Sequence, residues 1–194
     1  SLRAMPGLLV VRPADANECA QAWRCAVEAD QPVAMILSRQ SIPILAETAD
    51  LAAEGLRKGG YVLRRESGPA DLVLVGTGSE VHLCLGAADE LAAQGRSVRV
   101  VSLPCWEWFE DQDGAYRESV LPKGVPTLSV EAAASFGWDR YADASVAIDT
   151  YGASGPSQAV IDHFGFTVQN VTERALVLLG ARRDRATVGT DEPR

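Results

Sequence analysis

Arg39 is the residue of this sequence best placed for chemistry, because it follows an apolar run typical of a buried strand. The run extends from Pro32 to Leu37, and Ser38, Arg39 and Gln40 come directly after it. Open parallel sheets bind ligands at the carboxyl ends of their strands, and the fixed fork of a guanidinium group suits phosphate or carboxylate oxygens. The position predicts an anion-binding arginine, with a salt bridge at the strand end as the structural alternative.

A second candidate is the glycine-rich turn Gly76-Thr77-Gly78-Ser79, which follows an apolar strand and opens a helix. A helix N-terminus in this setting can bind phosphate. The turn lacks the third glycine of a dinucleotide-binding fingerprint and the Lys-Ser/Thr pair of a P-loop. We therefore favour a tight strand-to-helix turn with Ser79 as the N-cap, and nucleotide binding is the lesser alternative.

The remaining titratable candidates are isolated from one another. Glu131 ends a predicted strand, where it could act as an acid or base or, as we favour, orient the segment 135–138. His82 and His163 lie on separate predicted helices, with no cluster of carboxylates or cysteines beside them. The sequence predicts no metal site and no catalytic residue in this chain, and it predicts that His82 lies on the solvated surface.

Composition and charge narrow the classes of function. The 194 residues are 47% hydrophobic, with a formal net charge of −8 and a pI near 4.8. Nucleic-acid binders gain affinity from clustered Lys and Arg, so nucleic-acid binding is not expected. No run approaches the roughly 20 apolar residues that cross a bilayer, so no membrane association is predicted. The four cysteines make no CxxC pair and lie among apolar neighbours, which indicates reduced core thiols in a cytoplasmic protein.

Residues 1–42 have the pattern strand, helix, strand, which is typical of the last piece of a parallel α/β domain. Asp15 as N-cap and Glu18 three residues later form a capping box for the helix. Trp23 and Val27 are predicted on its apolar, core-facing side. Because a complete fold has little room before this helix, and the chain does not begin with Met, we expect it to be the tail of a longer protein.

A linker at 43–60 precedes a second α/β domain at 61–180. Its predicted strands are 61–65, 72–75, 98–103, 127–130 and 145–148. Because helical segments separate these strands, we expect a doubly wound, mostly parallel sheet, with the charged first strand as an antiparallel edge. The last helix is predicted to be capped by Asn170 and to end near Leu179, with 181–194 as a flexible tail.

Several short motifs occur in a fixed order along the chain. They are Arg-Pro-Ala-Asp-Ala-Asn-Glu at 12–18, Leu-Ser-Arg-Gln at 37–40, Gly-Gly-Tyr-Val at 59–62, Gly-Thr-Gly-Ser-Glu-Val at 76–81, Tyr-Arg-Glu-Ser-Val-Leu-Pro at 116–122, Gly-Trp at 137–138 and Phe-Gly-Phe-Thr at 164–167. Each is weak by itself, but their order and spacing together are specific. From Arg12 to about Leu179 the chain resembles the C-terminal third of transketolase.

That resemblance implies a fold and an activity. Transketolases are three-domain, thiamine-diphosphate-dependent homodimers with a divalent metal, magnesium or calcium, and they transfer a two-carbon ketol unit between sugar phosphates in the pentose phosphate pathway. On this mapping residues 1–42 end the pyrimidine-binding domain, and residues 61–180 form the C-terminal domain. The arginine with which the family grips the substrate phosphate corresponds to Arg39 and to no other residue here.

The resemblance also implies what lies elsewhere. The glutamate that activates the cofactor, the Gly-Asp-Gly metal motif and the substrate histidines would all precede Ser1, so this chain alone is expected to be inactive and to bind no cofactor. Deoxyxylulose-phosphate synthase and dihydroxyacetone synthase, thiamine enzymes of the same domain plan, stay open as alternatives. A different class also stays open, in which the region from Tyr61 is a non-catalytic anion-binding or interaction module with 76–79 as its pocket.

Overall fold

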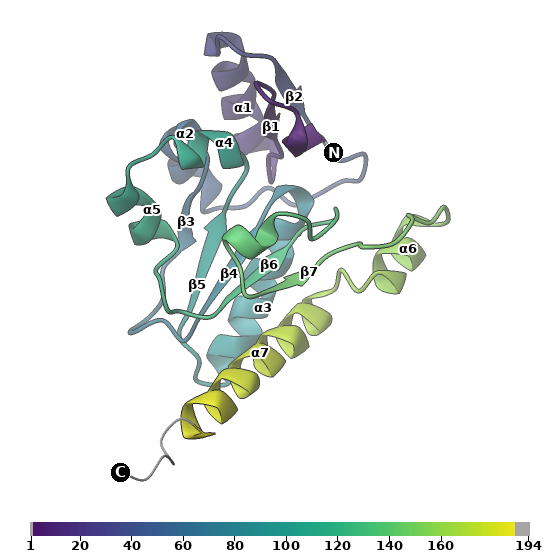
Figure 1. Ribbon diagram of the computed structural model, residues 1–194. Helices are drawn as coiled ribbons and strands as arrows, with labels where there is room; N and C mark the ends of the chain where they lie inside the picture. The colour runs from purple at the N-terminus through teal and green to yellow at the C-terminus, as the bar shows by residue number, and fades with distance from the viewer. Residues whose placement is uncertain (1, 189–194) are drawn as a thin grey trace.

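Two sheets organise the molecule (Figure 1). The computed structural model describes residues 2–188, with side chains to residue 182. The smaller sheet pairs β1 (Leu9–Val11) in parallel with β2 (Val33–Met35), and α1 (Ala16–Glu28) connects the two strands. The larger sheet has the strand order β3-β5-β4-β6-β7. The predicted strand–helix–strand unit followed by a second α/β sheet is confirmed.

The five-stranded sheet is mostly parallel. Its strands are β3 (Tyr61–Arg64), β4 (Leu72–Gly76), β5 (Val98–Ser102), β6 (Thr127–Val130) and β7 (Ala144–Val146). Only β3 is antiparallel to its neighbour, β5, so the predicted antiparallel edge strand is confirmed. Every residue of β4, β5 and β6 is buried, as expected for strands covered on both faces.

Helices cover both faces of this sheet (Figure 1). On one face pack α3 (Val81–Ala93) and α7 (Val168–Val188). On the other pack α4 (Trp106–Glu110) and α5 (Gly114–Val120), while α2 (Thr48–Arg57) packs on α1. Trp106, Phe109 and Trp138 are buried on this second face, and Trp106 and Trp138 meet edge to face at 4.9 Å. These three aromatic side chains are therefore part of the core.

Some local predictions are wrong, and α1 shows why. Trp23 and Val27 are 58% and 82% exposed, whereas the helix buries Ala22 and Cys25 against β1 and α2. The Asp15 cap is confirmed, because its carboxylate accepts the Glu18 backbone N–H at 2.9 Å. Helical periodicity locates an apolar stripe, but the elements that pack on the helix decide which side is covered.

The ends of the last helix also differ from the prediction. Asn170 is not its N-cap: α7 begins at Val168, and the Asn170 backbone N–H donates instead to the Thr167 hydroxyl oxygen at 3.2 Å. The helix continues past Leu179 to Val188, so 181–188, predicted as part of a flexible tail, are helical. The rest of that predicted tail, 189–194, lies outside the described residues. Within the described part of the chain, no helix is long and apolar enough to cross a membrane.

The two sheets are joined through β1 and the residues that follow β5. The Arg12 backbone N–H donates to the Pro104 carbonyl, and the Gly78 N–H donates to the Arg12 carbonyl, both at 2.9 Å. Val11 forms an isolated antiparallel bridge with Cys105. The first strand thus belongs to both halves of the molecule.

All four cysteines are free thiols, three of them buried and Cys19 partly exposed.

Candidate anion-binding site

An open cavity of about 1220 Å³ lies where the small sheet meets the large one. Three segments supply most of its lining: residues 37–43 after β2, residues between 79 and 83 around the start of α3, and residues between 153 and 161, which include the first part of α6 (Ser157–His163). Arg12 lines it as well. Two sites singled out in the sequence, Arg39 and the end of the 76–79 turn, therefore meet in one place.

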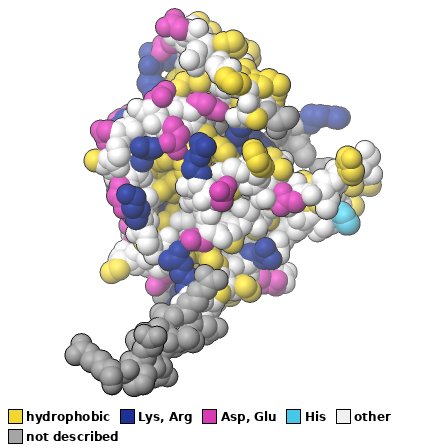
Figure 2. Space-filling view, in the orientation of Figure 1, with side chains coloured by type: hydrophobic (Ala, Val, Ile, Leu, Met, Phe, Trp, Pro, Cys, Tyr) yellow, Lys and Arg dark blue, Asp and Glu magenta, His cyan; other side chains and the backbone are white. Residues whose placement is uncertain are grey.

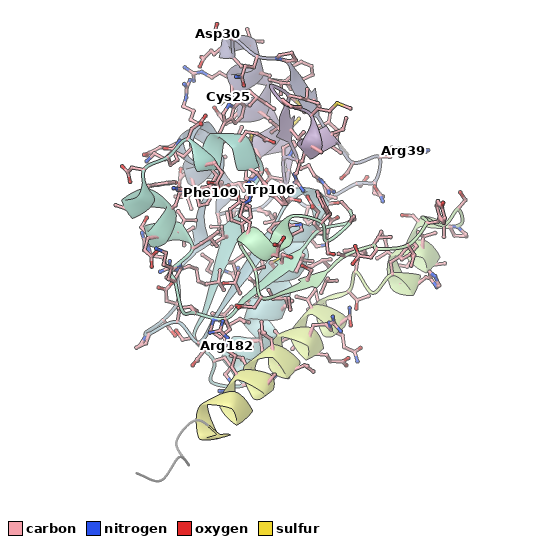
Figure 3. The ribbon with its side chains drawn as sticks, viewed as in Figure 1. Cys25, Asp30, Arg39, Trp106, Phe109 and Arg182 are labelled. Carbon is pink, nitrogen blue, oxygen red and sulfur yellow. The ribbon has the colours of Figure 1, made fainter. Side chains whose placement is uncertain are left out.

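Arg39 lies on a loop that is fastened at both ends. At the near end the Ile36 N–H donates to the Val11 carbonyl at 2.9 Å. At the far end the Asp15 carboxylate accepts the Leu45 N–H at 2.9 Å and the Thr48 hydroxyl at 2.6 Å. Figure 3 shows Arg39 projecting away from the body of the molecule, on the same side as α6. The loop therefore presents the guanidinium group to solvent.

No side chain in residues 2–182 forms an ion pair with Arg39, which is exposed. The salt bridge considered as its alternative is therefore not formed within this part of the chain. Arg12 is different, because its guanidinium pairs with Glu80 at 3.2 Å and with Glu131 at 3.1 Å. Of these two arginines of the cavity wall, Arg39 is thus the one whose guanidinium group is not paired with a described carboxylate.

Glu131 is buried, and each of its two carboxylate oxygens accepts two hydrogen bonds. It accepts two hydrogen bonds from Arg3, at 2.7 and 2.6 Å, and one each from Trp138 Nε1 at 2.8 Å and the Thr77 hydroxyl at 2.7 Å. Burial alone would raise the pKa of Glu131, but hydrogen bonding to Arg3 and the charges of Arg3 and Arg12 outweigh it and lower the pKa. An ionised, fully paired carboxylate is a poor proton donor or acceptor, so the structure favours its role in orienting Trp138.

The 76–79 turn is used for packing. Gly78 has φ +57°, and a Cβ there would come within 3.4 Å of the Arg12 side chain. Its N–H donates to the Arg12 carbonyl and is therefore not available to a phosphate. Ser79 does not cap α3, since its hydroxyl donates to Glu80 at 2.5 Å. The predicted tight turn is present, and the predicted Ser79 cap is wrong.

His82, predicted on the solvated surface, is instead half-buried and lines the cavity. It lies in the first turn of α3, and its Nδ1 hydrogen-bonds to the Ser79 carbonyl oxygen. The signal that sequence reasoning missed is topological. Residues that follow β1, β2 and β4 line the same cavity, although these strands belong to two different sheets. His163 does not line the cavity.

The residues present do not fit a metal-bound cofactor. Within residues 2–182 there is no group of three or more His, Cys, Asp or Glu side chains that could hold a metal ion. A diphosphate cofactor held through a divalent cation needs such oxygen ligands. The described side chains therefore offer no ligand set for such a cation.

Comparisons with known proteins agree with this architecture. The family model described as the pyrimidine binding domain of transketolase matches residues 1–44, and the transketolase-like C-terminal domain model matches residues 59–167. The transketolase of Geobacillus stearothermophilus is 50% identical over 186 residues, and that of a Nostoc species is 48% identical over 187. Each match covers 93% of this chain, which spans 28% of each relative.

Solved structures show the same likeness in three dimensions. The transketolase of Leishmania mexicana superimposes with a TM-score of 0.87 at 41% identity, covering 93% of this chain and 26% of that one. A Pichia stipitis transketolase mutant in complex with xylulose-5-phosphate gives 0.88 at 39% identity, covering 94% and 26%. Since the C-terminal domain model alone covers more than half of its residues, this chain belongs to the transketolase family.

Proposed function

We propose that this chain is the C-terminal part of a thiamine-diphosphate-dependent enzyme that transfers a two-carbon ketol unit between sugar phosphates. Its relatives are transketolases, which are transferases, and one neighbour was solved with xylulose-5-phosphate. We extend the proposal to a cytoplasmic homodimer that uses a divalent metal. Because the chain spans 28% of its relatives, we place the cofactor-activating groups outside it and infer that it is inactive alone.

The domain organisation is part of this proposal. Residues 1–42 would complete a pyrimidine-binding domain, 43–60 would link it, and 61–180 would be the C-terminal domain. The cavity between β2 and α3 then lies at the boundary of two domains. Ligand sites occur preferentially at such boundaries, which supports a substrate contact there.

Arg39 is the proposed substrate contact. The observation that supports this role is that its guanidinium group lines the cavity without an ion pair to any described carboxylate. Its loop is fastened at Val11 and Asp15, and no described carboxylate competes for the guanidinium group. A guanidinium can hold two oxygens of a phosphate with parallel hydrogen bonds. A phosphate at the far end of a sugar would thereby be held away from the reacting carbons.

Replacing Arg39 with Ala in the full-length enzyme tests the assignment. The loss of charge-assisted hydrogen bonds worth roughly 1.5–3 kcal/mol should lower kcat/KM for phosphorylated substrates about 10- to 100-fold. KM should carry much of the loss, because a phosphate grip acts in the ground state and the transition state alike. Steady-state kinetics should show a far smaller effect with hydroxypyruvate, which has no phosphate.

Two further variants make the result specific. Arg39→Lys should recover only part of the loss, because lysine supplies the charge without the two-pronged geometry. Arg65→Ala removes another exposed arginine, one that does not line the cavity, and should leave both substrates unaffected. Equal losses for phosphorylated and unphosphorylated donors would show that Arg39 supports the fold rather than the phosphate.

A further inference from the structure

His82 has a fixed orientation in the cavity wall. Its Nδ1 hydrogen-bonds to the carbonyl oxygen of Ser79, three residues earlier in the same turn. A carbonyl oxygen can only accept, so Nδ1 must carry the proton. In the neutral ring Nε2 is then an unprotonated acceptor. The backbone of the turn that precedes α3 therefore fixes the tautomer of this histidine.

Nε2 of His82 has no hydrogen-bond partner among the described side chains, whereas the charged groups beside it are occupied. Glu80 accepts from Arg12 at 3.2 Å and from the Ala132 N–H at 2.9 Å. The Arg39 guanidinium at one segment and the His82 acceptor at another thus line the cavity without a partner among the described side chains. One is suited to an anion and the other to a hydroxyl group.

We propose that His82 is a second ligand-binding residue of this cavity, with Nε2 accepting a hydrogen bond from a hydroxyl group of a phosphorylated sugar whose phosphate Arg39 holds. This inference rests on the phosphate role proposed for Arg39. The open cavity of about 1220 Å³ exceeds the roughly 300–1,000 Å³ typical of small-molecule sites, so it has room for such a ligand. His82 would then add a hydrogen bond to the binding of a phosphorylated sugar that inorganic phosphate, held by Arg39 alone, does not make.

The test separates the two ends of the ligand in the full-length holoenzyme. The measured quantities are KM and kcat for xylulose 5-phosphate, and the inhibition constant of inorganic phosphate, which carries no hydroxyl-bearing carbon chain. In His82→Asn, the shorter amide can still donate to the Ser79 carbonyl, but the acceptor in the cavity is lost. We expect KM to rise about 3- to 10-fold, with kcat and the phosphate inhibition constant unchanged.

A second substitution and a matched control complete the design. His82→Gln can place an amide oxygen near the position of Nε2 and should recover most of the affinity. His163→Asn makes the same change at the other histidine of the chain, which does not line the cavity, and should match the wild type.

The outcomes distinguish this inference from the proposed function. A wild-type KM in His82→Asn, while Arg39→Ala still weakens inhibition by phosphate, overturns the role of His82 alone. An equal rise in KM and in the phosphate inhibition constant for His82→Asn also overturns it, since His82 would then support the phosphate end. An unchanged phosphate inhibition constant in Arg39→Ala overturns the phosphate role of Arg39 itself.

Discussion

Two buried carboxylates join the halves of the molecule, and their environments differ. Glu131 faces the guanidinium groups of Arg3 and Arg12. Glu18 has neutral donors only: its side chain accepts from the Tyr61 hydroxyl at 2.7 Å, the Ser102 hydroxyl at 2.6 Å and the Ala14 N–H at 2.7 Å. Burial therefore raises the pKa of Glu18 despite these hydrogen bonds. The two groups have opposite effects on stability as the pH changes.

Glu131→Gln should destabilise the chain. The substitution leaves Arg3 and Arg12, both mostly buried, facing a neutral amide. Removing one partner of a buried ion pair typically costs about 3 kcal/mol. Urea unfolding followed by tryptophan fluorescence should show it, because Trp138 donates to Glu131 and Trp106 stacks on Arg3.

The pH dependence of the free energy of unfolding tests the explanation given for Glu131→Gln. Because the folded-state pKa of Glu131 is lowered, its stabilising contribution is complete above the unfolded value of about 4.3 and is lost as the pH falls through the folded value. The stability difference between wild type and Glu131→Gln should therefore narrow in acid. Glu28→Gln, at an exposed carboxylate, should change stability little at any pH. A difference that is constant with pH would contradict the ion-pair explanation.

At the scale of elements, the junction between α2 and β3 depends on one glycine. Gly59 has φ +76°, and a Cβ there would lie 2.3 Å from the Phe109 backbone nitrogen and 2.4 Å from the Cys105 carbonyl oxygen. The Gly59 carbonyl also accepts the Cys105 N–H at 3.0 Å. Gly59→Ala should therefore cost about 3 kcal/mol, measured as a shift of the urea midpoint, because backbone rather than a flexible side chain must move.

Gly124→Ala is the matched control for that substitution. Gly124 also has a positive φ, +81°, but a Cβ there meets nothing within 4 Å. It should show only the conformational cost of a left-handed alanine, about 1 kcal/mol. Equal losses at the two positions would mean that backbone strain alone, and not the close approach of α4, explains Gly59.

At the scale of the whole molecule, the two sheets differ in protection. Within residues 2–188, β2 pairs only with β1 and each of its residues is partly exposed, whereas β4 is central and fully buried. Figure 2 shows hydrophobic side chains exposed over the part of the molecule that contains β1 and β2. Amide exchange in this chain should therefore be faster in β2 than in β4. Equal protection would show that the two sheets open as one unit.

The sequence by itself determined most of the elements. Apolar runs predicted β4, β5 and β6, the charges of 61–65 predicted the antiparallel edge, and Asp15 predicted the start of α1. These features depend on neighbours within a few residues, where local preferences and periodicity act directly. The same reasoning predicted Arg39 directly after a buried strand that reaches Leu37, whereas β2 ends at Met35 and is partly exposed, and Arg39 lies on the loop beyond it.

Only the tertiary structure decided which residues meet. Glu131 lies 128 positions from Arg3, and no periodicity or spacing connects them. The exposure of Trp23 likewise follows from how α1 packs on β1 and α2, and the position of His82 in the Arg39 cavity follows from how the two sheets meet. Which side chains pair across a sheet edge depends on how elements far apart in the sequence pack together. A strand or a helix cap depends on residues that are neighbours in the sequence.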